Sequence, residues 1–567
     1  MKDLIIKKLS ELLDLKILAG EDKFKIRAYE NAIFSLEKIE TDILKSYKSG
    51  ELKNFKGIGK GIYSVIEEII ISGESKQIIE LKKKFPETLF DLFKISGLGP
   101  RRIKSLYDEL SVKSIEDLKK AHNENLLSKI KGFGEKFQKN LIENILKVES
   151  YSGKYLFITA WKQSEDLRIS LEKTGFFKKI EIVGSVRRRI EIAEKIEMLA
   201  VSDRIKEIAD YIIKIESVKE IISSNDSLIR FRFLSGIICE IKFLDEIEFY
   251  GGLIFFTGSN KHIAALNGAL EKSGIKISNS VIFKNNLKIS SSSERELYED
   301  VFGMQYIEPE LRENGNAINL AFENKIPVLI SENDIKGIFH IHTSASDGTL
   351  TIEQIYGILK QSGYIYAGIS DHSKSAFYAR GLSDDFLLRQ RDFINEFNKE
   401  HRDFYFYSGI ESDILSDGSL DYDDSVLKKL DFVIASVHSG FKMTKSEMTR
   451  RICSALKNNY CAALGHPTGR LLLSREGYEI DIKEIIKTAS GENKMIELNC
   501  NPYRMDIDWR NLEYAKKMNV KIMLSPDAHH KENFEYIRLG VFAARKGMLE
   551  KIDVINTYGE PFPKKMF

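Results

Sequence analysis

The most informative segment of the chain reads Ile338-Phe339-His340-Ile341-His342, an apolar run that contains two histidines. A short apolar run is consistent with a buried strand, and the i, i+2 spacing puts both imidazoles on one face of it. The chain continues into Ser346-Asp347-Gly348, which adds a carboxylate just beyond the strand. This segment therefore predicts a strand whose carboxyl end presents metal-binding groups.

The same pattern returns throughout the C-terminal third, from about residue 335 to residue 567. Seven short apolar strands are expected there, most of them followed by a helical stretch: Ile338–Ile341, Tyr366–Ile369, Phe404–Tyr407, Phe432–Val437, Ala462–Leu464, Met495–Leu498 and Lys521–Leu524. Alternating strands and helices predict an α/β fold, a distorted (β/α)7-type barrel. In a barrel the carboxyl ends of the strands meet at one rim, where active sites lie.

Nearly every expected strand ends in a residue type that binds metal ions. The candidates are His340, His342, Asp347, His372, Glu411, His438, His466, Asp527 and His529. A lone histidine after a strand is more often a capping or packing residue, but nine candidates on successive strand ends are difficult to explain in that way. Eight of the 10 histidines lie after Lys336, which also points to metal chemistry here. Imidazole and carboxylate ligands suit Zn, Mn or Fe rather than Ca.

Composition places this barrel in a larger soluble protein. The chain has 567 residues, too many for one hydrophobic core, so about three to four domains are expected. Apolar residues make up 43% and charged residues 30%, which is ordinary for a globular protein. The four cysteines have no CxxC spacing, which indicates reduced thiols rather than a disulfide framework or a zinc finger. Without a signal-peptide core or a membrane-spanning run, a cytoplasmic protein is expected.

Residues from about 1 to 150 read as short helices separated by glycine-containing turns. The pattern Gly-apolar-Gly occurs three times, each time beside a basic residue or a helix start. Glycines let a phosphate approach the backbone, and the helix start offers unpaired N–H groups. One copy could be an ordinary turn, but three copies favour sequence-independent DNA binding and resemble helix-hairpin-helix motifs. The predicted DNA-binding residues are Gly57, Gly59, Lys60, Gly97, Gly99, Arg101, Arg102, Gly132, Gly134 and Lys136.

The middle of the chain, from about 151 to 325, mixes strand-like and helical runs, which predicts an α+β domain. Strands are expected at Ile180–Val183, Met198–Val201, Ile237–Ile241 and Leu253–Phe256. Four motifs follow one another along the chain: Arg27-Ala28-Tyr29, Gly184-Ser185-Val186-Arg187-Arg188, Phe255-Phe256-Thr257-Gly258-Ser259 and Pro309-Glu310-Leu311-Arg312-Glu313.

In this order the motifs resemble those of bacterial family X DNA polymerases (polymerase beta-like) that carry a C-terminal PHP (polymerase and histidinol phosphatase) domain. The resemblance covers nearly the whole chain. It implies a helix-hairpin-helix DNA-binding region at 1–150, a nucleotidyltransferase palm and thumb at 151–325, and a PHP phosphoesterase domain at 335–567.

The resemblance also implies a two-metal polymerase site in the palm, and here the sequence departs from the family. The family has an Asp pair spaced i, i+2 and a third Asp on a neighbouring strand, because two-metal catalysis needs dense negative charge. Lys195, Glu197 and Glu240 stand at these positions, and Ile263 and Asn267 also depart from the family's nucleotide pocket. We expect an inactive palm with doubtful Mg²⁺ binding and the vestigial nucleotide-binding residues Gly184, Ser185, Arg188, Lys195, Glu197, Glu240, Gly258 and Ser259. A polymerase that uses Glu197 and Glu240 alone is the alternative.

In the PHP domain the ligand order matches the family position by position. By resemblance three divalent ions are bound: His340, His342, Glu411 and Asp527 hold the first, Glu411, His438 and His466 the second, and Asp347, His372 and His529 the third. Glu411 can bridge two ions because a carboxylate has two oxygens. Hydrolysis of a phosphate ester is expected at Glu411, His438 and Asp527, with Arg470 and Arg475 as phosphate clamps. Asp371, Asp413 and His530 are interpreted as supporting residues and His401 as a surface residue.

Several functions stay open. The favoured one is a DNA phosphoesterase in repair, such as a 3′→5′ exonuclease or end-trimming enzyme, with an inactive polymerase domain and with DNA bound through its backbone at gaps or ends. A working repair polymerase with a proofreading PHP domain is disfavoured by Lys195. A non-catalytic DNA-binding scaffold is disfavoured by the complete ligand set, and a small-molecule phosphatase by the hairpins.

Overall fold

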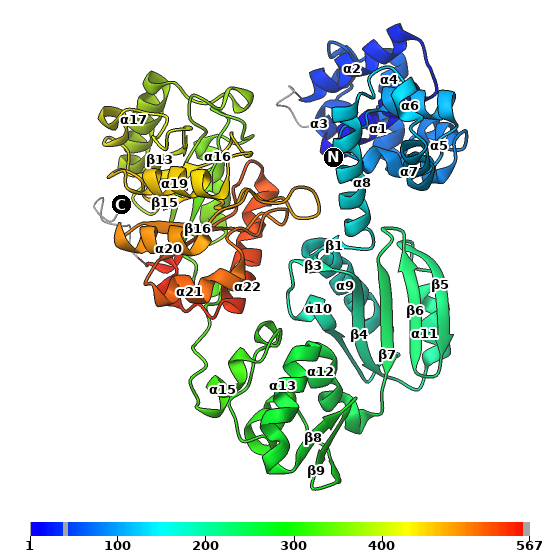
Figure 1. The fold of residues 1–567 in the computed structure, drawn as a ribbon, viewed down its shortest axis with the longest axis vertical. Coiled ribbons are helices and arrows are strands. Elements are labelled where there is room, and N and C mark those ends of the chain that lie inside the picture. The colour runs from blue at the N-terminus through cyan, green and yellow to red at the C-terminus, as the bar shows by residue number, and fades with distance from the viewer. Residues whose placement is uncertain (1, 38–42, 560–567) are drawn as a thin grey trace. The chain divides into compact units, whose positions relative to one another are not determined.

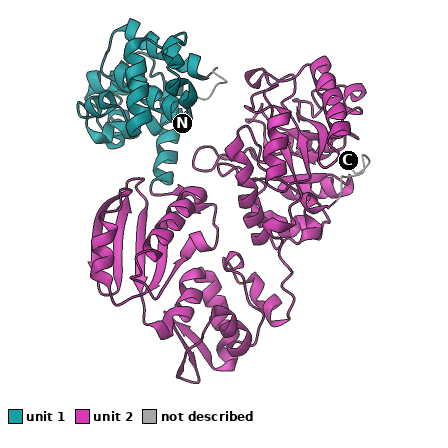
Figure 2. Cartoon of the chain, turned by 180° about the vertical axis from the view of Figure 1, so that it is seen from behind, with its two compact units in different colours: residues 1–152 teal, residues 153–567 magenta. Residues whose placement is uncertain are grey.

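The computed structural model describes residues 2–37 and 43–559. The chain divides into two compact units, residues 1–152 and 153–567 (Figure 2). The final residues of the predicted PHP domain, 560–567, lie outside the described part. In that described part, no helix has the length and apolar character needed to cross a bilayer.

Unit 1 is built from short helices, as expected. They are α1 (Lys2–Leu18), α2 (Lys23–Glu37), α3 (Ile43–Lys48), α4 (Lys60–Ser72), α5 (Lys76–Lys82), α6 (Pro100–Leu110), α7 (Ile115–Asn123) and α8 (Glu135–Tyr151) (Figure 1). In α1, Ile5, Leu9 and Leu12 recur at helical spacing and are fully buried. They belong to one apolar core, and a second core gathers the apolar side chains of α6, α7 and α8.

Unit 2 opens with a five-stranded sheet in the order β2-β4-β7-β6-β5. Its strands are β2 (Lys179–Val183), β4 (Lys195–Val201), β7 (Ile238–Phe243), β6 (Leu228–Phe233) and β5 (Val218–Asn225). Helices α9 (Phe157–Glu172) and α11 (Ile205–Ile212) supply apolar side chains to its core. Strands β4 and β7 are parallel neighbours with Glu197 opposite Glu240. This register brings together two of the three positions aligned with the polymerase carboxylates.

The expected strand at Leu253–Phe256 is wrong, because these residues lie in helix α12 (Phe249–Thr257). The run is apolar on all sides, and such a run can be either a buried helix or a buried strand. Here α12 packs beside β4 and β2, where it buries Leu253 and Ile254. Helix α13 (Asn260–Leu270), the small sheet β10-β9-β8 (Leu287–Ile289, Val281–Lys284, Ile275–Ser278) and α15 (Asn316–Phe322) follow.

The predicted barrel is confirmed. Seven parallel strands follow one another in sequence order: β11 (Gly337–Ile341), β12 (Tyr366–Ile369), β13 (Tyr405–Asp413), β14 (Phe432–Ser436), β15 (Ala463–Leu464), β16 (Met495–Asn499) and β17 (Ile522–Ser525). A parallel bridge between Ile341 and Ala528 joins the two ends, so the barrel is nearly closed. The helices between strands are α16 (Ile352–Gln361), α17 (Asp384–Glu400), α18 (Asp424–Leu427), α19 (Lys445–Leu456), α20 (Ile482–Gly491) and α21 (Leu512–Lys517), and α22 (Ile537–Lys546) follows β17.

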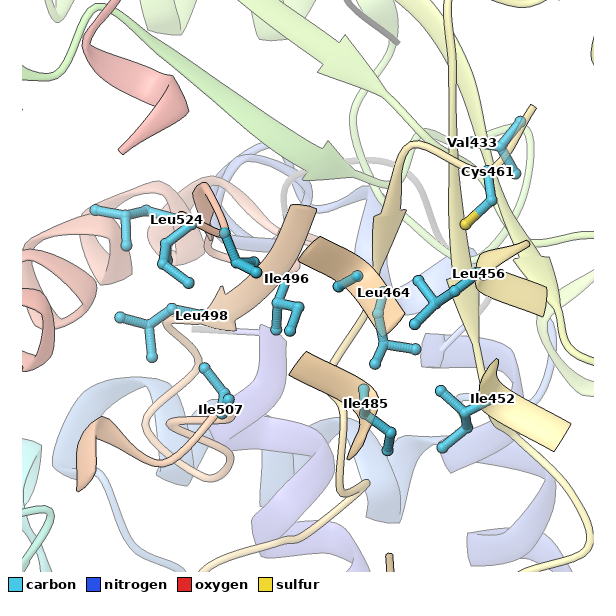
Figure 3. Close-up of a cluster of buried hydrophobic side chains, with 14 of the residues drawn as sticks. Val433, Ile452, Leu456, Cys461, Leu464, Ile485, Ile496, Leu498, Ile507 and Leu524 are labelled. Carbon is cyan, nitrogen blue, oxygen red and sulfur yellow. The ribbon is translucent and has the colours of Figure 1, made fainter. Parts of the chain in front are cut away.

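A large apolar core lies between these strands and the helices outside them. Figure 3 shows Leu464 and Ile496 of the strands near Ile452 of α19 and Ile485 of α20. These side chains are fully buried. Apolar side chains pack the strands against the helices on the outside of the barrel. The strand ends are therefore left to present polar residues at the rim.

Candidate metal centre

The carboxyl ends of the barrel strands bring all nine predicted metal ligands together. β11 supplies His340, and His342 follows directly after this strand. β13 supplies Glu411, and the loops that follow the strands supply the others. The burial is unusual for polar groups: His340, His342, Glu411 and His466 are almost completely removed from solvent. Burying so many ionisable groups is costly unless they are paired or coordinate a metal.

Glu411 lies at the middle of the cluster. Its Oε1 is 2.9 Å from His466 Nε2, 3.2 Å from His438 Nε2 and 3.3 Å from His340 Nε2. Its Oε2 is 2.9 Å from His372 Nδ1 and 3.7 Å from His342 Nε2. The two oxygens of one carboxylate therefore face different groups of imidazoles, which is the arrangement that a ligand bridging two cations requires.

Asp527 and Asp347 stand on either side of this centre. Asp527 Oδ1 is 3.3 Å from His342 Nε2 and 3.6 Å from His340 Nε2. Asp347 is 3.3 Å from His529 Nε2 and 3.5 Å from His372 Nε2. Asp527 thus lies beside two members of the predicted first ligand group, and Asp347 lies beside two members of the predicted third group.

Four groups of side chains are close enough to share a cation: His342, Asp347, His372 and His529; His340, His466 and Asp527; His340, His342 and Glu411; and His372, Glu411 and His438. Among the described residues, every such group belongs to the barrel. His466 and His372 thus also lie within reach of ligands that the resemblance assigns to other ions.

The donor set fits divalent cations. Several buried atoms of the cluster have no hydrogen-bond partner in the described part of the chain, among them His340 Nε2, both ring nitrogens of His342 and Glu411 Oε2. A buried polar atom without a partner is costly, and a cation at this place would satisfy these lone pairs. The residues present therefore fit the group that the family implies.

Two opposed effects, burial and nearby opposite charges, set the pKa values of His340 and Glu411 in the cluster. Burial acts to lower the pKa of His340, but the carboxylates of Glu497, Glu411 and Asp527 raise it well above its ordinary value. Burial acts to raise the pKa of Glu411, but the surrounding histidines, His438 first, hold it well below its ordinary range. Glu411 is thus held as a carboxylate, the form that binds metal.

Two of the candidate ligands have a left-handed backbone. The φ angles are 62° at His340 and 53° at Asp527. Such conformations cost energy in residues with a side chain, and they gather at functional sites. His340 and Asp527 lie on the two strand ends that meet where the barrel closes, since Ala528 N donates to His340 O.

Sequence reasoning missed Glu497, which is fully buried in β16. His340 Nδ1 donates to Glu497 Oε1 over 2.5 Å, and the backbone N of His466 donates to Glu497 Oε2 over 2.5 Å. One carboxylate thus fixes two candidate ligands and leaves His340 Nε2 directed at the cluster. The alternation of apolar residues with Glu497 and Asn499 in β16 is a signal that could have indicated an inward-facing carboxylate.

The supporting role expected for Asp413 and Asp371 matches their contacts. His438 Nδ1 donates to Asp413 Oδ1 over 2.5 Å, which orients His438 Nε2 toward Glu411. Asp371 accepts from the backbone N and the hydroxyl of Thr343, each over 2.7 Å, and from Gln390 Nε2 over 2.6 Å. It therefore anchors the loop that carries Asp347.

The predicted phosphate clamp Arg470 is corrected by its contacts. Its guanidinium donates to Arg504 O over 2.9 Å, to Asp508 over 2.7 Å and to Met505 O. Arg475 donates to Gly469 O and lies over the Phe441 ring. The arginine that reaches the cluster is Arg504, whose Nε is 3.5 Å from Asp527 Oδ2. Sequence spacing could not reveal this, because Arg504 follows a different strand from Arg470.

The three predicted hairpins share one local geometry. The first glycine of each has a positive φ of 91° at Gly57, 89° at Gly97 and 93° at Gly132. The second glycines Gly59, Gly99 and Gly134 are extended and directly precede α4, α6 and α8. The apolar residues between them, Ile58, Leu98 and Phe133, are buried, while the glycines and the predicted basic residues Lys60, Arg101, Arg102 and Lys136 are exposed.

Arg102 is exposed, and its side chain also stabilises the hairpin. It donates to Gly97 O over 2.7 Å and lies 4.3 Å from the centre of the Phe137 ring. Arg101 beside it remains the freer cation of this hairpin, since no ion pair of its side chain occurs in the described chain.

In the palm, Lys195 joins the two carboxylates that the family would use for metals. Its Nζ is 2.8 Å from Glu240 Oε2 and 2.9 Å from Glu197 Oε1. Two more cations contact the same pair: Lys242 Nζ is 3.0 Å from Glu197 Oε1, and Arg230 Nε is 3.4 Å from Glu240 Oε1. Lysine and arginine side chains therefore neutralise the acidic pair in this structure.

The other vestigial residues lie around an open pocket of about 1020 Å³ lined by Gly184, Ser185, Arg188, Lys195, Glu197, Gly258 and Ser259, among others. Arg188 is engaged there, with Nε 2.6 Å from Glu313 and NH1 donating to Thr257 O. Asn267, which replaces the family's Arg, hydrogen-bonds both the N and the O of Ile277. It thus holds the edge of β8 and does not extend a cation into the pocket.

Comparison with known proteins agrees with this architecture. Residues 1–75 match the family model of the helix-hairpin-helix domain, residues 89–145 that of the SAM-like helix-hairpin-helix tandem, and residues 252–313 that of the DNA polymerase beta thumb. The DNA polymerase/3'-5' exonuclease PolX of Bacillus subtilis is 33% identical over 559 residues, which cover 97% of this chain and 96% of that protein.

Two further relatives match a smaller part of the chain. A protein of Caldicellulosiruptor saccharolyticus named "Probable phosphatase" is 33% identical over 34% of this chain and 79% of its own length. A protein of Acetivibrio thermocellus with the same name is 32% identical over 27% of this chain and 65% of its own length.

Proposed function

The chain belongs to the family X DNA polymerases that carry a C-terminal PHP domain, and we propose that it hydrolyses phosphodiester bonds at DNA ends, as a 3′→5′ exonuclease. The observation that supports this most directly is the buried cluster around Glu411, with nine ligand-type side chains at one barrel rim. Divalent ions bound there would activate water and neutralise the charge on the phosphate oxygens. We propose three such ions, of Zn, Mn or Fe, which are the metals that imidazole and carboxylate ligands suit.

The chain's own residues divide the work. Glu411, with one oxygen toward His466 and His438 and the other toward His372, holds the centre together. Asp413 holds the ring of His438 through Nδ1, and Glu497 holds the ring of His340 in the same way. In this orientation the Nε2 atom of each ring can bind a metal ion. We propose that Arg504, beside Asp527, binds a phosphate oxygen of the substrate, which is the role first expected of Arg470.

Unit 1 supplies affinity for the DNA backbone in this proposal. Each hairpin exposes two glycines and a helix start, so that backbone N–H groups can contact phosphates without reading bases. We propose gapped or ended DNA as the substrate, with residues 151–325 as palm and thumb and 335–567 as the hydrolytic domain. Affinity should then fall steeply with salt and depend little on base sequence.

The test is incubation of the full chain with Mn²⁺ and an end-labelled primer-template, with and without dNTPs. Shortening of the primer in both conditions is expected. An intact primer in the presence of bound metal would refute the proposal.

A phosphomonoesterase is the second candidate, because two relatives of this domain are named as phosphatases. Rapid release of phosphate from p-nitrophenyl phosphate, together with an intact primer, would favour it.

A further inference from the structure

Two aromatic side chains stand in solvent at the rim of the metal cluster. Phe377 and Tyr378 form a short 3-10 helix, Phe377–Ala379, in the loop between β12 and α17. Their exposed fractions are 86% and 72%, although large apolar rings are normally buried. Within the described chain, the only ring in contact with Tyr378 is the ligand candidate His372, with centroids 6.0 Å apart, and Phe377 has no ring contact.

Tyr378 is close to the reacting centre and not merely on the same domain. The His372 ring that it contacts has Nδ1 2.9 Å from Glu411 Oε2 and Nε2 3.5 Å from Asp347 Oδ2. Together with the ring contact to His372, this places the Tyr378 side chain beside the cluster. A group bound to the cluster would therefore have the Tyr378 ring as a neighbour.

Two arginines accompany this ring at the rim. Arg380, two residues later, is exposed and has no ion pair or side-chain hydrogen bond in the described part of the chain. Arg504 lies on another loop, with its Nε 3.5 Å from Asp527 Oδ2. Exposed aromatic faces combined with cations are the features by which proteins hold single-stranded nucleic acid, because bases stack on the rings and phosphates pair with the cations.

We propose that Tyr378 stacks on an unpaired base next to the phosphodiester that is cleaved, with Phe377 contacting a base further along the strand and Arg380 contacting the backbone. This inference rests on the proposed function and adds the residues that recognise the base. A base inside a duplex has both faces covered by its neighbours, whereas an unpaired nucleotide can present a face to Tyr378. Successive residues of a 3-10 helix point in different directions, so the two rings serve different bases.

The experiment uses full-length Tyr378→Ala, with Tyr378→Trp as the variant that keeps a stacking face. Phe393→Ala is the matched control, since Phe393 is an exposed aromatic residue of α17 in the same domain. Two single-stranded oligonucleotides are compared. One carries 2-aminopurine at its 3′ end, and the other is abasic at the same position.

The parent should quench 2-aminopurine fluorescence, and Tyr378→Ala should lose this quenching and raise KM for the base-bearing strand about tenfold. Tyr378→Ala should cleave the abasic strand as the parent does and should bind the same amount of metal. Phe393→Ala should behave like the parent on both strands. Tyr378→Trp should restore the parental KM. A loss of activity equal on both strands would show a purely structural role and overturn the inference. Parental KM and parental quenching in Tyr378→Ala would also overturn the inference. The exposed rings would then serve another partner, such as a protein.

Binding separates this inference from the proposed function. Quenching is measured in a Glu411→Gln background, in which no hydrolysis is expected. If the parent cleaves no strand but quenching depends on Tyr378, the stacking role is supported and the nuclease activity is refuted. If the parent cleaves DNA and neither quenching nor KM depends on Tyr378, the nuclease activity is supported and the stacking role is refuted.

Discussion

At the scale of single residues, Glu411 is the side chain on which the centre depends most. Glu411→Gln keeps the shape but removes the charge that would let two cations lie close together despite their repulsion. We expect loss of DNA shortening and a lower bound metal content, with salt-sensitive DNA binding nearly unchanged. Elemental analysis and a primer-shortening assay measure both, and Glu400→Gln at the end of α17 is the control. Full metal occupancy or parental trimming in Glu411→Gln would contradict the bridging role.

Glu497 tests whether orientation of a ligand matters as much as the ligand. Glu497→Gln removes the charge that holds His340 Nδ1 and the backbone of His466. Loss of such a supporting carboxylate typically weakens metal affinity by about 10- to 100-fold. The expected result is inactivation at a lower chelator concentration, measured by titration with EDTA. The exposed Glu492→Gln is the control, and equal chelator sensitivity of the two variants would rule out the role.

Arg504 and Arg470 are expected to differ in kind. Arg504→Gln should raise KM for DNA about tenfold or more without lowering the melting temperature, because its guanidinium faces the cluster. Arg470→Gln should instead destabilise the domain by about 2 kcal/mol, because it breaks hydrogen bonds to Asp508 and to two backbone carbonyls. Thermal unfolding and steady-state kinetics of both variants separate the roles. A lower melting temperature for Arg504→Gln alone would reverse the assignment.

At the scale of elements, the hairpins combine a turn at a glycine of positive φ with an open helix start. Gly132→Ala should destabilise unit 1 by about 1–2 kcal/mol, because its φ of 93° is unfavourable for alanine. Gly134 has an ordinary φ of −63°, and a Cβ built there meets nothing within 4 Å. Gly134→Ala should therefore fold normally but bind DNA more weakly, since its methyl group stands where a phosphate would approach the start of α8. Denaturant unfolding and fluorescence anisotropy check the pair, and parental DNA affinity of Gly134→Ala would exclude this hairpin from the interface.

At the scale of the whole molecule, the palm and the barrel are expected to behave differently with nucleotides. Lys195, Lys242 and Arg230 are paired with Glu197 and Glu240, so dNTPs and Mg²⁺ should give no primer extension while Mn²⁺ supports shortening. Lys195→Asp with Glu197→Asp and Glu240→Asp need not restore extension, because Arg188 is paired with Glu313 and Asn267 is bound to Ile277. Gel analysis of a primer-template measures both activities. Robust dNTP-dependent extension by the parent would show that the palm is active.

Local patterns in the sequence were sufficient to predict the barrel and to name the side chains that cluster at its rim. A strand has a repeat of two, so His340 and His342 had to share a face, and parallel barrel strands had to bring their carboxyl ends to one rim. The hairpins were predictable for a similar reason, because Gly57, Gly97 and Gly132 occupy a conformation that few other residues adopt.

Only the tertiary structure decided which groups meet across strands. Glu497 binds His340 from a strand 157 positions along the chain, and Arg504, not Arg470, reaches Asp527. Leu253–Phe256 became a helix because its apolar residues are buried on several sides, so the local pattern carried no period to distinguish a helix from a strand. Side-chain periodicity determines which face of an element a residue occupies, whereas packing between elements determines what that face meets.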